Sequence, residues 1–444
     1  MPAATKIPTE EKFCILGAGS SGLAAAKNFL EAGIPFDCLE REDDIGGNWY
    51  YGKPASSVYA STHLISSKRL TEFTDFPMPE DYPPYPGREL VWQYFQAYAA
   101  HFGLREHIQF DTAVKRLEPT GSGEQGWQVE LNSGEVRHYC GVVIANGHNW
   151  NPRWPEESWL ERGGRFAGEV LHSSEYKTPD ALHGKRVLVV GGGNSGCDLA
   201  VEAAIHADRA VLSTRRNYPV LPKFFRGKPI DQCNELLQWL RLPLWFRRLA
   251  ARGVTHLTLG PAERTGVPRP DHRLFETHPV INSQIHHHVG HGNLELRGDV
   301  KRFDGLEVEF MDGSRAEFDL VIYATGFLVS FPFVEQQHLN WQRGAPELFL
   351  NVFHPERDDL FCIGLIQPDS GQWGLVDYQS QLVAKYLLAM QKKLSQAEWF
   401  RRLKSNGAAD LSSGVQYKKS PRHRLEVEHY GYQKRLKKLI RRLG

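Results

Sequence analysis

Two glycine-rich turns of the same spacing constrain the fold of this chain more than any other feature. Each turn lies between a short apolar segment and a segment of helical composition. Their glycines are Gly17, Gly19 and Gly22 in the first turn and Gly191, Gly193 and Gly196 in the second. This spacing lets the backbone approach a pyrophosphate and directs the N-terminus of a helix at it. One such turn is weak evidence, but two in one chain predict two dinucleotide sites.

The order of apolar strands and helices predicts an α/β fold with two Rossmann-like dinucleotide-binding domains, the second inserted into the first. We expect residues 1–162 to form the first part of one dinucleotide-binding domain and residues 163–328 to form the other. Residues 329–444 are expected to return to the first domain and to end in C-terminal helices. Residues 217–293 depart from the strand–helix alternation, so we interpret them as a helical insertion on the substrate or nicotinamide side.

An acidic residue after the second strand indicates the nucleotide of the first domain. Residues 36–39 form the predicted strand, and Glu40 stands at its end, close to the expected distance of about 20 residues from the glycine turn. A carboxylate there accepts hydrogen bonds from a ribose 2′-hydroxyl and would repel a 2′-phosphate. The first site therefore suits FAD or NAD rather than NADP.

The second domain has no carboxylate at the corresponding place. Residues 210–213 form the predicted strand, and Thr214, Arg215 and Arg216 follow it. Guanidinium groups pair with phosphate through charged hydrogen bonds of about 1.5–3 kcal/mol each. The second site therefore suits NADPH, and the alternative is a solvated basic turn.

The composition excludes several classes of protein. Hydrophobic residues make up 41% of the chain and charged residues 24%, with a formal net charge of +1, which gives no electrostatic reason to expect nucleic acid as a partner. No apolar run approaches the roughly 18 residues of a membrane span, and the N-terminus lacks the apolar core of a secretory signal. The 6 cysteines form no C-x-x-C pair. We therefore expect a cytoplasmic protein without a transmembrane segment.

Two further segments leave alternatives open. The run 286–288 with His291 is rich in histidine, but neighbouring helical side chains point in different directions and no carboxylate or cysteine stands at ligand spacing, so we expect no metal site. The basic segment 432–443 carries apolar residues at helical spacing. It either packs on its own protein, which we favour, or touches an anionic membrane.

A motif F-x-G-x-x-x-H-x-x-x-Y-K precedes the second glycine turn. Its residues are Phe166, Gly168, His172, Tyr176 and Lys177. With both turns, Glu40 and other motifs in order, the chain resembles class B flavoprotein monooxygenases, specifically the flavin-containing monooxygenase group. The other motifs are Gly46-Gly47-Asn48-Trp49, Asp75-Phe76-Pro77, His278-Pro279 with Asn282, and Ala324-Thr325-Gly326-Phe327. Tyr176-Lys177 favours this branch over the similar Baeyer–Villiger enzymes, which usually carry Trp followed by Pro or Asp there.

The resemblance implies a reaction. NADPH reduces tightly bound FAD, and the reduced flavin reacts with O2 to give a C4a-(hydro)peroxyflavin. A soft N or S atom of a small-molecule substrate then takes the distal oxygen, as in N,N-dimethylaniline monooxygenases, while NADP+ stays bound. The alternatives are Baeyer–Villiger oxygenation of ketones, an uncoupled NADPH oxidase, and a nucleotide sensor without turnover. A homodimer is left open.

The predicted cofactor sites comprise the two turns and their surroundings. The FAD site comprises Gly17, Gly19, Ser20, Ser21, Gly22, Glu40, Arg41, Gly47, Trp49, Val114 and Gln367. The NADPH site comprises Gly191, Gly193, Asn194, Ser195, Gly196, Arg215 and Arg216. His172, Tyr176 and Lys177 are interpreted either as a link between the two modules or as packing residues at a domain boundary.

One residue departs from the family pattern. The resemblance places an Asn in the loop before Lys68, close to the flavin N5 and the nicotinamide, but this chain has Ile65 there. Ile cannot donate the amide hydrogen bond, so Ser66, Ser67, Thr62 or a water would have to supply a donor. Ile65, Ser66 and Asn282 are the predicted catalytic residues. The substitution predicts an enzyme that leaks reducing equivalents or is adapted to another substrate.

Overall fold

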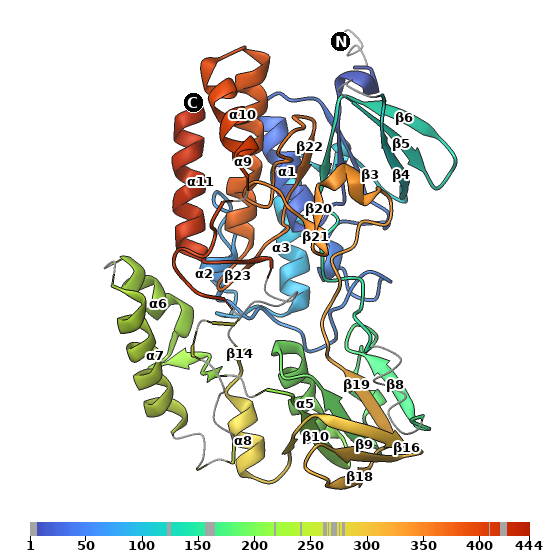
Figure 1. Cartoon of the computed structure of the whole chain (residues 1–444), viewed down its shortest axis with the longest axis vertical. Coiled ribbons are helices and arrows are strands. Elements are labelled where there is room, and N and C mark those ends of the chain that lie inside the picture. Colours follow the sequence, from blue (N-terminus) through green and yellow to red (C-terminus); the bar gives the residue numbers. More distant parts are fainter. Residues whose placement is uncertain are drawn as a thin grey trace. The chain divides into compact units, whose positions relative to one another are not determined.

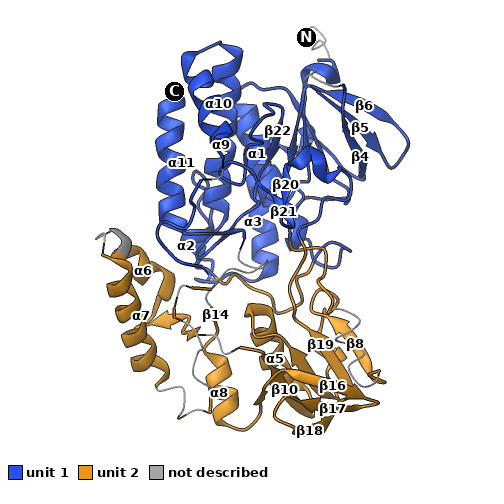
Figure 2. Cartoon of the chain, viewed as in Figure 1, with its two compact units in different colours: residues 1–56, 66–148, 329–444 blue, residues 57–65, 149–328 orange. Residues whose placement is uncertain are grey.

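The computed structural model describes most of the chain, and these residues form two compact units (Figure 2). Unit 1 comprises Met1–Ser56, Ser66–His148 and Val329–Gly444, and unit 2 comprises Ser57–Ile65 and Asn149–Leu328. The described residues are 7–121, 126–155, 165–216, 219–239, 242–260, 264, 266–267, 273–274, 276–277, 280–407, 409–417 and 424–444. The short segment 57–65 therefore belongs to unit 2 although the sequence on both sides of it belongs to unit 1.

A parallel sheet of five strands forms the centre of unit 1. Its order is β22-β7-β1-β2-β3. The strands are Phe13–Leu16 (β1), Phe36–Leu39 (β2), Ile108–Gln109 (β3), Gly141–Ile144 (β7) and Leu360–Cys362 (β22). They read as nearly continuous apolar runs because both faces of a parallel sheet are covered. Strands β7 and β22 pair in this sheet, although residues 149–328 of unit 2 lie between them in sequence. The second Rossmann-like domain is therefore inserted into the first, as predicted.

Unit 1 also contains helices, and the first of them packs directly on the sheet (Figure 1). They are Ser20–Glu31 (α1), Lys68–Thr71 (α2), Arg88–His101 (α3), Trp373–Gln391 (α9), Ser395–Ser405 (α10) and His429–Leu443 (α11). Helix α9 packs against α1 on one side and α11 on another. Leu436, Leu439 and Leu443 of α11 are buried, and Ile440 is half-buried. This confirms that the apolar face of the basic C-terminal helix packs on its own protein.

Small sheets and 3-10 turns complete unit 1. An antiparallel meander joins Val114–Pro119 (β4), Trp127–Leu131 (β5) and Val136–Tyr139 (β6). Two-stranded pairs join Trp341–Gln342 (β20) to Ala345–Pro346 (β21) and Gln367–Pro368 (β23) to Glu426–Val427 (β24). The 3-10 turns are Thr9–Glu11 (η1), Gly47–Trp49 (η2), Arg105–His107 (η3) and Gln336–Leu339 (η6).

Unit 2 repeats the plan with a second parallel sheet, in the order β15-β10-β9-β19-β8. Its strands are Glu169–His172 (β8), Arg186–Val190 (β9), Arg209–Ser213 (β10), Glu295–Arg297 (β15) and Leu320–Tyr323 (β19). Helix Asn194–His206 (α5) connects β9 to β10, and the 3-10 turn Pro179–Ala181 (η4) precedes β9. A meander of Val300–Asp304 (β16), Glu307–Phe310 (β17) and Arg315–Glu317 (β18) lies between β15 and β19 in sequence. The fold is therefore α/β with two Rossmann-like domains.

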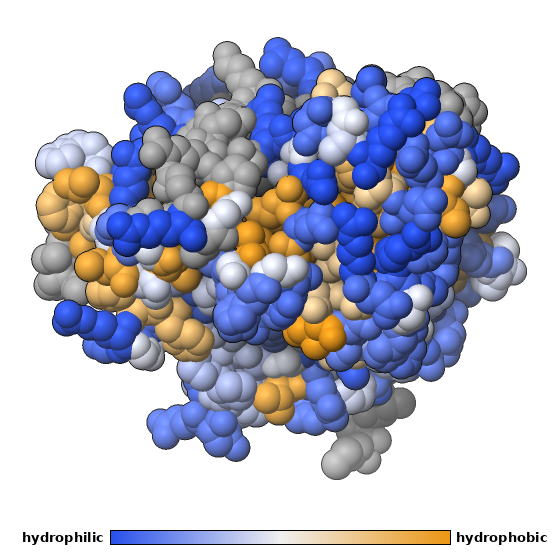
Figure 3. All heavy atoms as spheres, turned by 90° about the horizontal axis from the view of Figure 1, so that it is seen from below, coloured by the Kyte–Doolittle hydropathy of each residue, from blue (hydrophilic) through white to orange (hydrophobic). Residues whose placement is uncertain are grey.

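The segment interpreted as an insertion contains helices and short strands. They are Val220–Leu221 (β11), Phe224–Phe225 (β12), Lys228–Pro229 (β13), Ile230–Trp239 (α6), Leu244–Leu259 (α7), Val280–Ile281 (β14) and Gln284–Gly290 (α8). On α7, Trp245, Leu249 and Leu257 are 66%, 61% and 78% exposed. Figure 3 shows hydrophobic surface among the hydrophilic residues in the view from below. Among the helices that the structure describes, none combines the length and apolarity needed to cross a bilayer.

Candidate functional site

The first glycine turn has the geometry of a phosphate-binding turn. Gly17 has a φ of +100°, a left-handed conformation that favours glycine. A Cβ on Gly22 would lie 1.7 Å from the carbonyl oxygen of Gly17, so no side chain fits there. Helix α1 begins directly after Gly19, which has no side chain to cap its first amides. These amides are therefore suited to bind a phosphate.

The Gly-Gly-x-Trp motif packs directly on this turn. The Gly46 amide donates to the Ala18 carbonyl at 3.1 Å. A Cβ on Gly47 would lie 2.9 Å from the Cα of Gly19, so two backbones approach each other where side chains would fill the space. The Trp49 ring contacts the Trp373 ring edge to face, at 6.2 Å between centroids. The structure thus brings together Gly19 and Gly47, two glycines that were predicted for the FAD site.

Glu40 is fixed beside the same turn. Its side chain is 5% exposed, and its two oxygens accept hydrogen bonds from the Ala18 amide at 2.6 Å and the Glu42 amide at 3.0 Å. Burial raises the pKa of Glu40 above its ordinary value, although both amides and Arg41 act to lower it. Each carboxylate oxygen retains a lone pair that can accept from a ribose hydroxyl. Arg41 is exposed and pairs with Glu42 at 3.2 Å.

The other predicted FAD residues lie in the same unit. Ser20 is the first residue of α1, and Ser21 is buried next to it. Val114 opens strand β4 and Gln367 opens β23, and both are half-buried. Their cofactor contacts stay predictions. Gly364 was not among the predicted residues, but a Cβ there would lie 2.0 Å from the Ser21 hydroxyl oxygen. In sequence it is a glycine two residues after an apolar strand, which does not indicate Ser21 as its neighbour.

The second turn repeats the first in detail. Gly191 has a φ of +123°, and a Cβ there would lie 2.4 Å from the Ala324 carbonyl oxygen. A Cβ on Gly196 would lie 1.7 Å from the Gly191 carbonyl oxygen. Helix α5 begins after Gly193, again without a side-chain cap, and Ser195 in its first turn is exposed. Unit 2 therefore has a second helix N-terminus suited to a phosphate.

The end of strand β10 in unit 2 differs from the end of β2 in unit 1. Ser213 is buried and donates to the Gly298 carbonyl at 2.7 Å, while Arg215 and Arg216 follow in exposed positions. Within the part of the chain that the structure describes, the Arg215 guanidinium has no ion pair. An exposed guanidinium in place of a buried carboxylate fits a 2′-phosphate.

The three predicted catalytic residues lie in different settings. Ile65 is 36% exposed and ends the segment 57–65 of unit 2, whereas Ser66 belongs to unit 1. Asn282 is buried, donates to Asp198 at 2.7 Å and accepts from the amides of Gln284 and Ile285 at the start of α8. Catalytic roles for Ile65, Ser66 and Asn282 stay predictions. His278 and Pro279 of the same motif lie outside the described residues.

The motif before the second turn ties segments of unit 2 together. His172 is buried, and its Nε2 donates to the Gly326 carbonyl at 3.1 Å. The Tyr176 hydroxyl donates to Glu202, and Lys177 donates to the Val58 carbonyl at 3.3 Å. The motif therefore connects the loop after β19 and α5 to a segment that lies in sequence within the first module.

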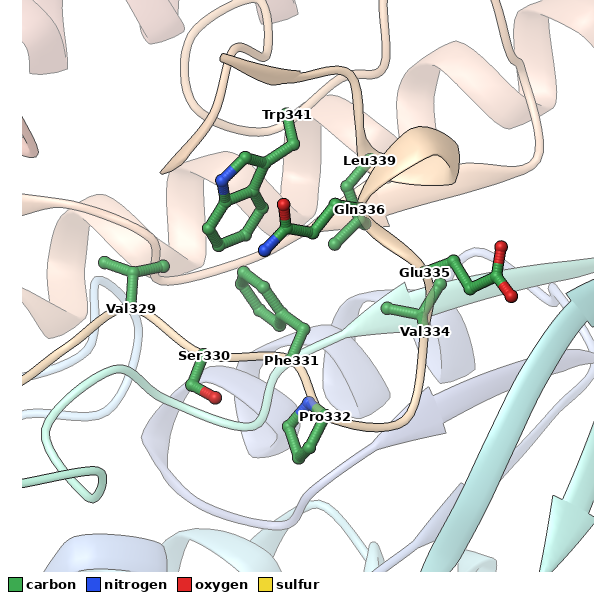
Figure 4. Close-up of a pocket in the computed structure, with 9 residues that line it drawn as sticks. All are labelled: Val329, Ser330, Phe331, Pro332, Val334, Glu335, Gln336, Leu339 and Trp341. Carbon is green, nitrogen blue, oxygen red and sulfur yellow. The ribbon is translucent and has the colours of Figure 1, made fainter. Parts of the chain in front are cut away.

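A pocket of about 360 Å³ lies in unit 1 (Figure 4). Its lining residues come from 329–341, and the Phe331 and Trp341 rings contact each other edge to face, at 6.1 Å between centroids, beside the Gln336 side chain. The Asn146 amide donates to the Ser330 carbonyl at 3.4 Å, so the pocket adjoins the loop after β7. None of the predicted site residues lines this pocket.

The chain is similar to known proteins over most of its length. Residues 10–420 match the family described as flavin-binding monooxygenase-like. The chain is 34% identical to flavin-containing monooxygenase 5 of Rattus norvegicus over 411 residues, which cover 88% of this chain and 75% of that protein. It is 31% identical to flavin-containing monooxygenase 2 of Homo sapiens over 393 residues, 84% of this chain and 73% of that protein.

Solved structures show the same fold. A variant of cyclohexanone monooxygenase from Rhodococcus, solved with NADP+, matches with a TM-score of 0.72 and 17% identity over 98% of each chain. A flavin-containing monooxygenase from Stenotrophomonas maltophilia matches with a TM-score of 0.64 and 22% identity, over 85% of this chain and 98% of that chain. At these identities the likeness concerns the fold alone.

Proposed function

The chain belongs to the flavin-binding monooxygenase-like family, and on this premise we propose that it is an NADPH-dependent FAD monooxygenase that oxygenates soft N or S atoms of small molecules. It is an enzyme of the flavin-containing monooxygenase kind, with FAD and NADP(H) as cofactors. One observation carries the assignment of the two nucleotides: a buried carboxylate, Glu40, follows the first glycine turn, and an exposed guanidinium, Arg215, follows the second.

In this proposal each unit holds one cofactor. The N-terminal amides of α1 bind the FAD pyrophosphate, and Glu40 accepts a hydrogen bond from a ribose hydroxyl. The N-terminal amides of α5 bind the NADPH pyrophosphate, and Arg215 with Arg216 binds the 2′-phosphate. When bound, the cofactors supply the hydride and the activation of O2. The residues of the chain then position the cofactors and exclude water rather than exchange protons with the substrate.

A spectroscopic experiment tests the function. The purified protein should be yellow, NADPH should bleach it without air, and O2 should restore the colour. With a thioether, a tertiary amine and a cyclic ketone as substrates, we expect the sulfoxide and the N-oxide. A lactone as the main product would instead identify Baeyer–Villiger oxygenation, and binding of both nucleotides without bleaching would identify a sensor.

Arg215→Ala should raise the NADPH KM by about 10- to 100-fold, because it removes charged hydrogen bonds of about 1.5–3 kcal/mol each. The NADH KM should change little, since NADH has no 2′-phosphate. Steady-state kinetics with both nucleotides measure the difference. Arg252→Ala, which removes an exposed arginine from α7, is the control and should leave both values unchanged. Equal effects of Arg215→Ala on both nucleotides would reject the phosphate contact.

Ile65 also favours a second activity, the release of H2O2 from NADPH oxidation. We expect the wild type to release a substantial share of its electrons as H2O2 even with a good thioether present. Ile65→Asn should lower that share by roughly 2- to 10-fold, the effect of one added hydrogen bond of about 0.5–1.5 kcal/mol. Ile65→Leu, which adds no donor, is the matched control. The measurement is H2O2 formed per NADPH consumed, and negligible peroxide from the wild type would contradict the leak.

A further inference from the structure

Helix α5 carries a polar stripe that begins at the predicted phosphate site. Asn194, Asp198 and Glu202 follow each other at intervals of four residues, so their side chains lie on one face of the helix. Asn194 is the first residue of α5, Asp198 lies one turn later, and Glu202 lies one turn further. All three residues and the partners described below belong to unit 2.

The first two residues of the stripe fix the strand and helix that carry Asn282. The Asn194 side-chain oxygen accepts from the Ile281 amide at 3.0 Å. Asp198 accepts from the Asn282 side-chain nitrogen at 2.7 Å. The oxygen of Asn282 is then directed at the first amides of α8, at 2.9 and 3.2 Å. The orientation of the Asn282 amide is therefore set by Asp198 on one side and α8 on the other.

The third residue of the stripe fixes the segment 57–65. The two carboxylate oxygens of Glu202 accept from the Ser61 hydroxyl and the Tyr176 hydroxyl. The Tyr176 ring contacts the Tyr59 ring edge to face, at 5.6 Å between centroids. One oxygen of the Glu202 carboxylate therefore binds the segment 57–65, and the other binds Tyr176 of the motif that supports this segment.

Lys223 connects the insertion to the same segment. Its ammonium group donates to Nε2 of His63, and Nδ1 of His63 donates to the Ser61 carbonyl at 2.9 Å. The positive charge of Lys223 and the carboxylate of Asp198 also interact electrostatically. The segment 57–65 is therefore held by α5, by residues 176–177 and by the insertion.

We propose that Asp198 and Glu202 are positioning residues: Asp198 orients Asn282, and Glu202 holds the segment that ends at Ile65. The proposal rests on the proposed function, because Asn282 and Ile65 are the residues predicted for the reaction site. One helix then binds the nucleotide phosphates at its N-terminus and orients both predicted catalytic elements with its polar stripe. In this proposal both carboxylates act through the residues that they hold, Asn282, Ser61 and Tyr176.

Hydrogen–deuterium exchange of the flavin-loaded protein tests the proposal without turnover. In Glu202→Ala, peptides that cover 57–65 should exchange at least about tenfold faster, since the hydrogen bond to Ser61 and the hydrogen bond to the supporting Tyr176 are both lost. The Ala60 amide, which donates to the Lys177 carbonyl at 2.8 Å, should be the most affected. Glu202→Gln should restore protection because its amide can still bond both hydroxyls. Ile205→Ala, which removes an exposed side chain of α5, is the control.

Asp198→Ala should give the complementary pattern, with faster exchange at 282–290 and little change at 57–65. In kinetics, Glu202→Ala should lower kcat by about tenfold while the NADP+ Kd changes by less than about twofold, because the helix N-terminus is intact. If Glu202→Ala does not fold, Ser61→Ala removes one of the same hydrogen bonds from the exposed side.

Unchanged exchange at 57–65 in Glu202→Ala would overturn the proposal. Faster exchange spread evenly over unit 2 would also overturn it, because Glu202 would then only support the fold. A wild type that fails to reduce its flavin with NADPH would refute the proposed function instead. Hydrogen–deuterium exchange does not depend on flavin reduction, so the two failures can be told apart.

Discussion

Gly22→Ala should be purified with much less flavin than the wild type, whereas Gly196→Ala should stay yellow and bind NADPH more weakly. In each variant the new Cβ would lie 1.7 Å from a carbonyl oxygen of its own glycine turn, Gly17 or Gly191. Relieving such a contact shifts the turn, and overpacking of this kind costs about 1–3 kcal/mol. Because binding needs the unshifted turn, we expect about 10- to 100-fold weaker affinity for one nucleotide in each variant.

The two variants are matched controls for each other. Flavin content is measured from the visible spectrum of the purified protein, and NADP+ affinity by calorimetric titration. Gly253→Ala adds the same methyl group to a helix glycine with nothing within 4 Å and should change neither quantity. Loss of flavin in Gly196→Ala with retention in Gly22→Ala would reverse the assignment of the two sites.

Asp377→Ala should lower the free energy of unfolding of the protein by about 3–5 kcal/mol, the usual cost of removing one partner of a buried ion pair. Asp377 on α9 is fully buried and accepts hydrogen bonds from Asn28, at 2.7 Å, and from Thr74. It also forms an ion pair with Lys27 at 3.1 Å. The Lys27 side chain is only 2% exposed and would keep two partly exposed carboxylates, Asp75 at 2.5 Å and Glu31 at 3.7 Å. Loss of Asp377 therefore leaves a buried cation underpaired.

Denaturant unfolding at pH 7 measures the loss, with Asp81→Ala at an exposed position as the control. Burial alone would lower the pKa of Lys27, but Asp377 and Asp75 more than offset it and the pKa is raised above 10.5. The contribution of Lys27 is therefore complete below pH 10.5 and is lost as the pH rises through the folded-state pKa. Equal unfolding midpoints for Asp377→Ala and Asp81→Ala would contradict the role of this ion pair.

Local spacing was enough to predict both glycine turns and the strands beside them. A strand, a turn and a helix start are encoded within about ten residues, so Gly17 to Gly22 and Gly191 to Gly196 could be identified without knowing the fold. Glu40 was predictable for the same reason, because its place is set by the length of one helix and one strand. The return of the chain to the first sheet at β22 followed from an apolar run after the second module.

Contacts between distant segments could not be predicted in this way. Nothing near Gly47 or Gly364 in sequence indicates that Gly47 packs on Gly19 or that Gly364 packs on Ser21. The transfer of 57–65 to unit 2 depends on Tyr176, Lys177 and Glu202, which lie more than a hundred residues downstream. Its composition resembles that of the residues around it, so sequence alone assigned it to the first domain.

The pairing of β22 with β7 has a consequence for synthesis on the ribosome. The edge of the first sheet at β7 has no partner strand until residues 360–362 have been made. At about 5–20 residues per second, the residues between the two strands take roughly 10–40 s to appear. From residue 328 until residue 362, unit 2 is complete in sequence while unit 1 still exposes an unpaired parallel edge. The nascent chain therefore completes the inserted unit before the unit that surrounds it.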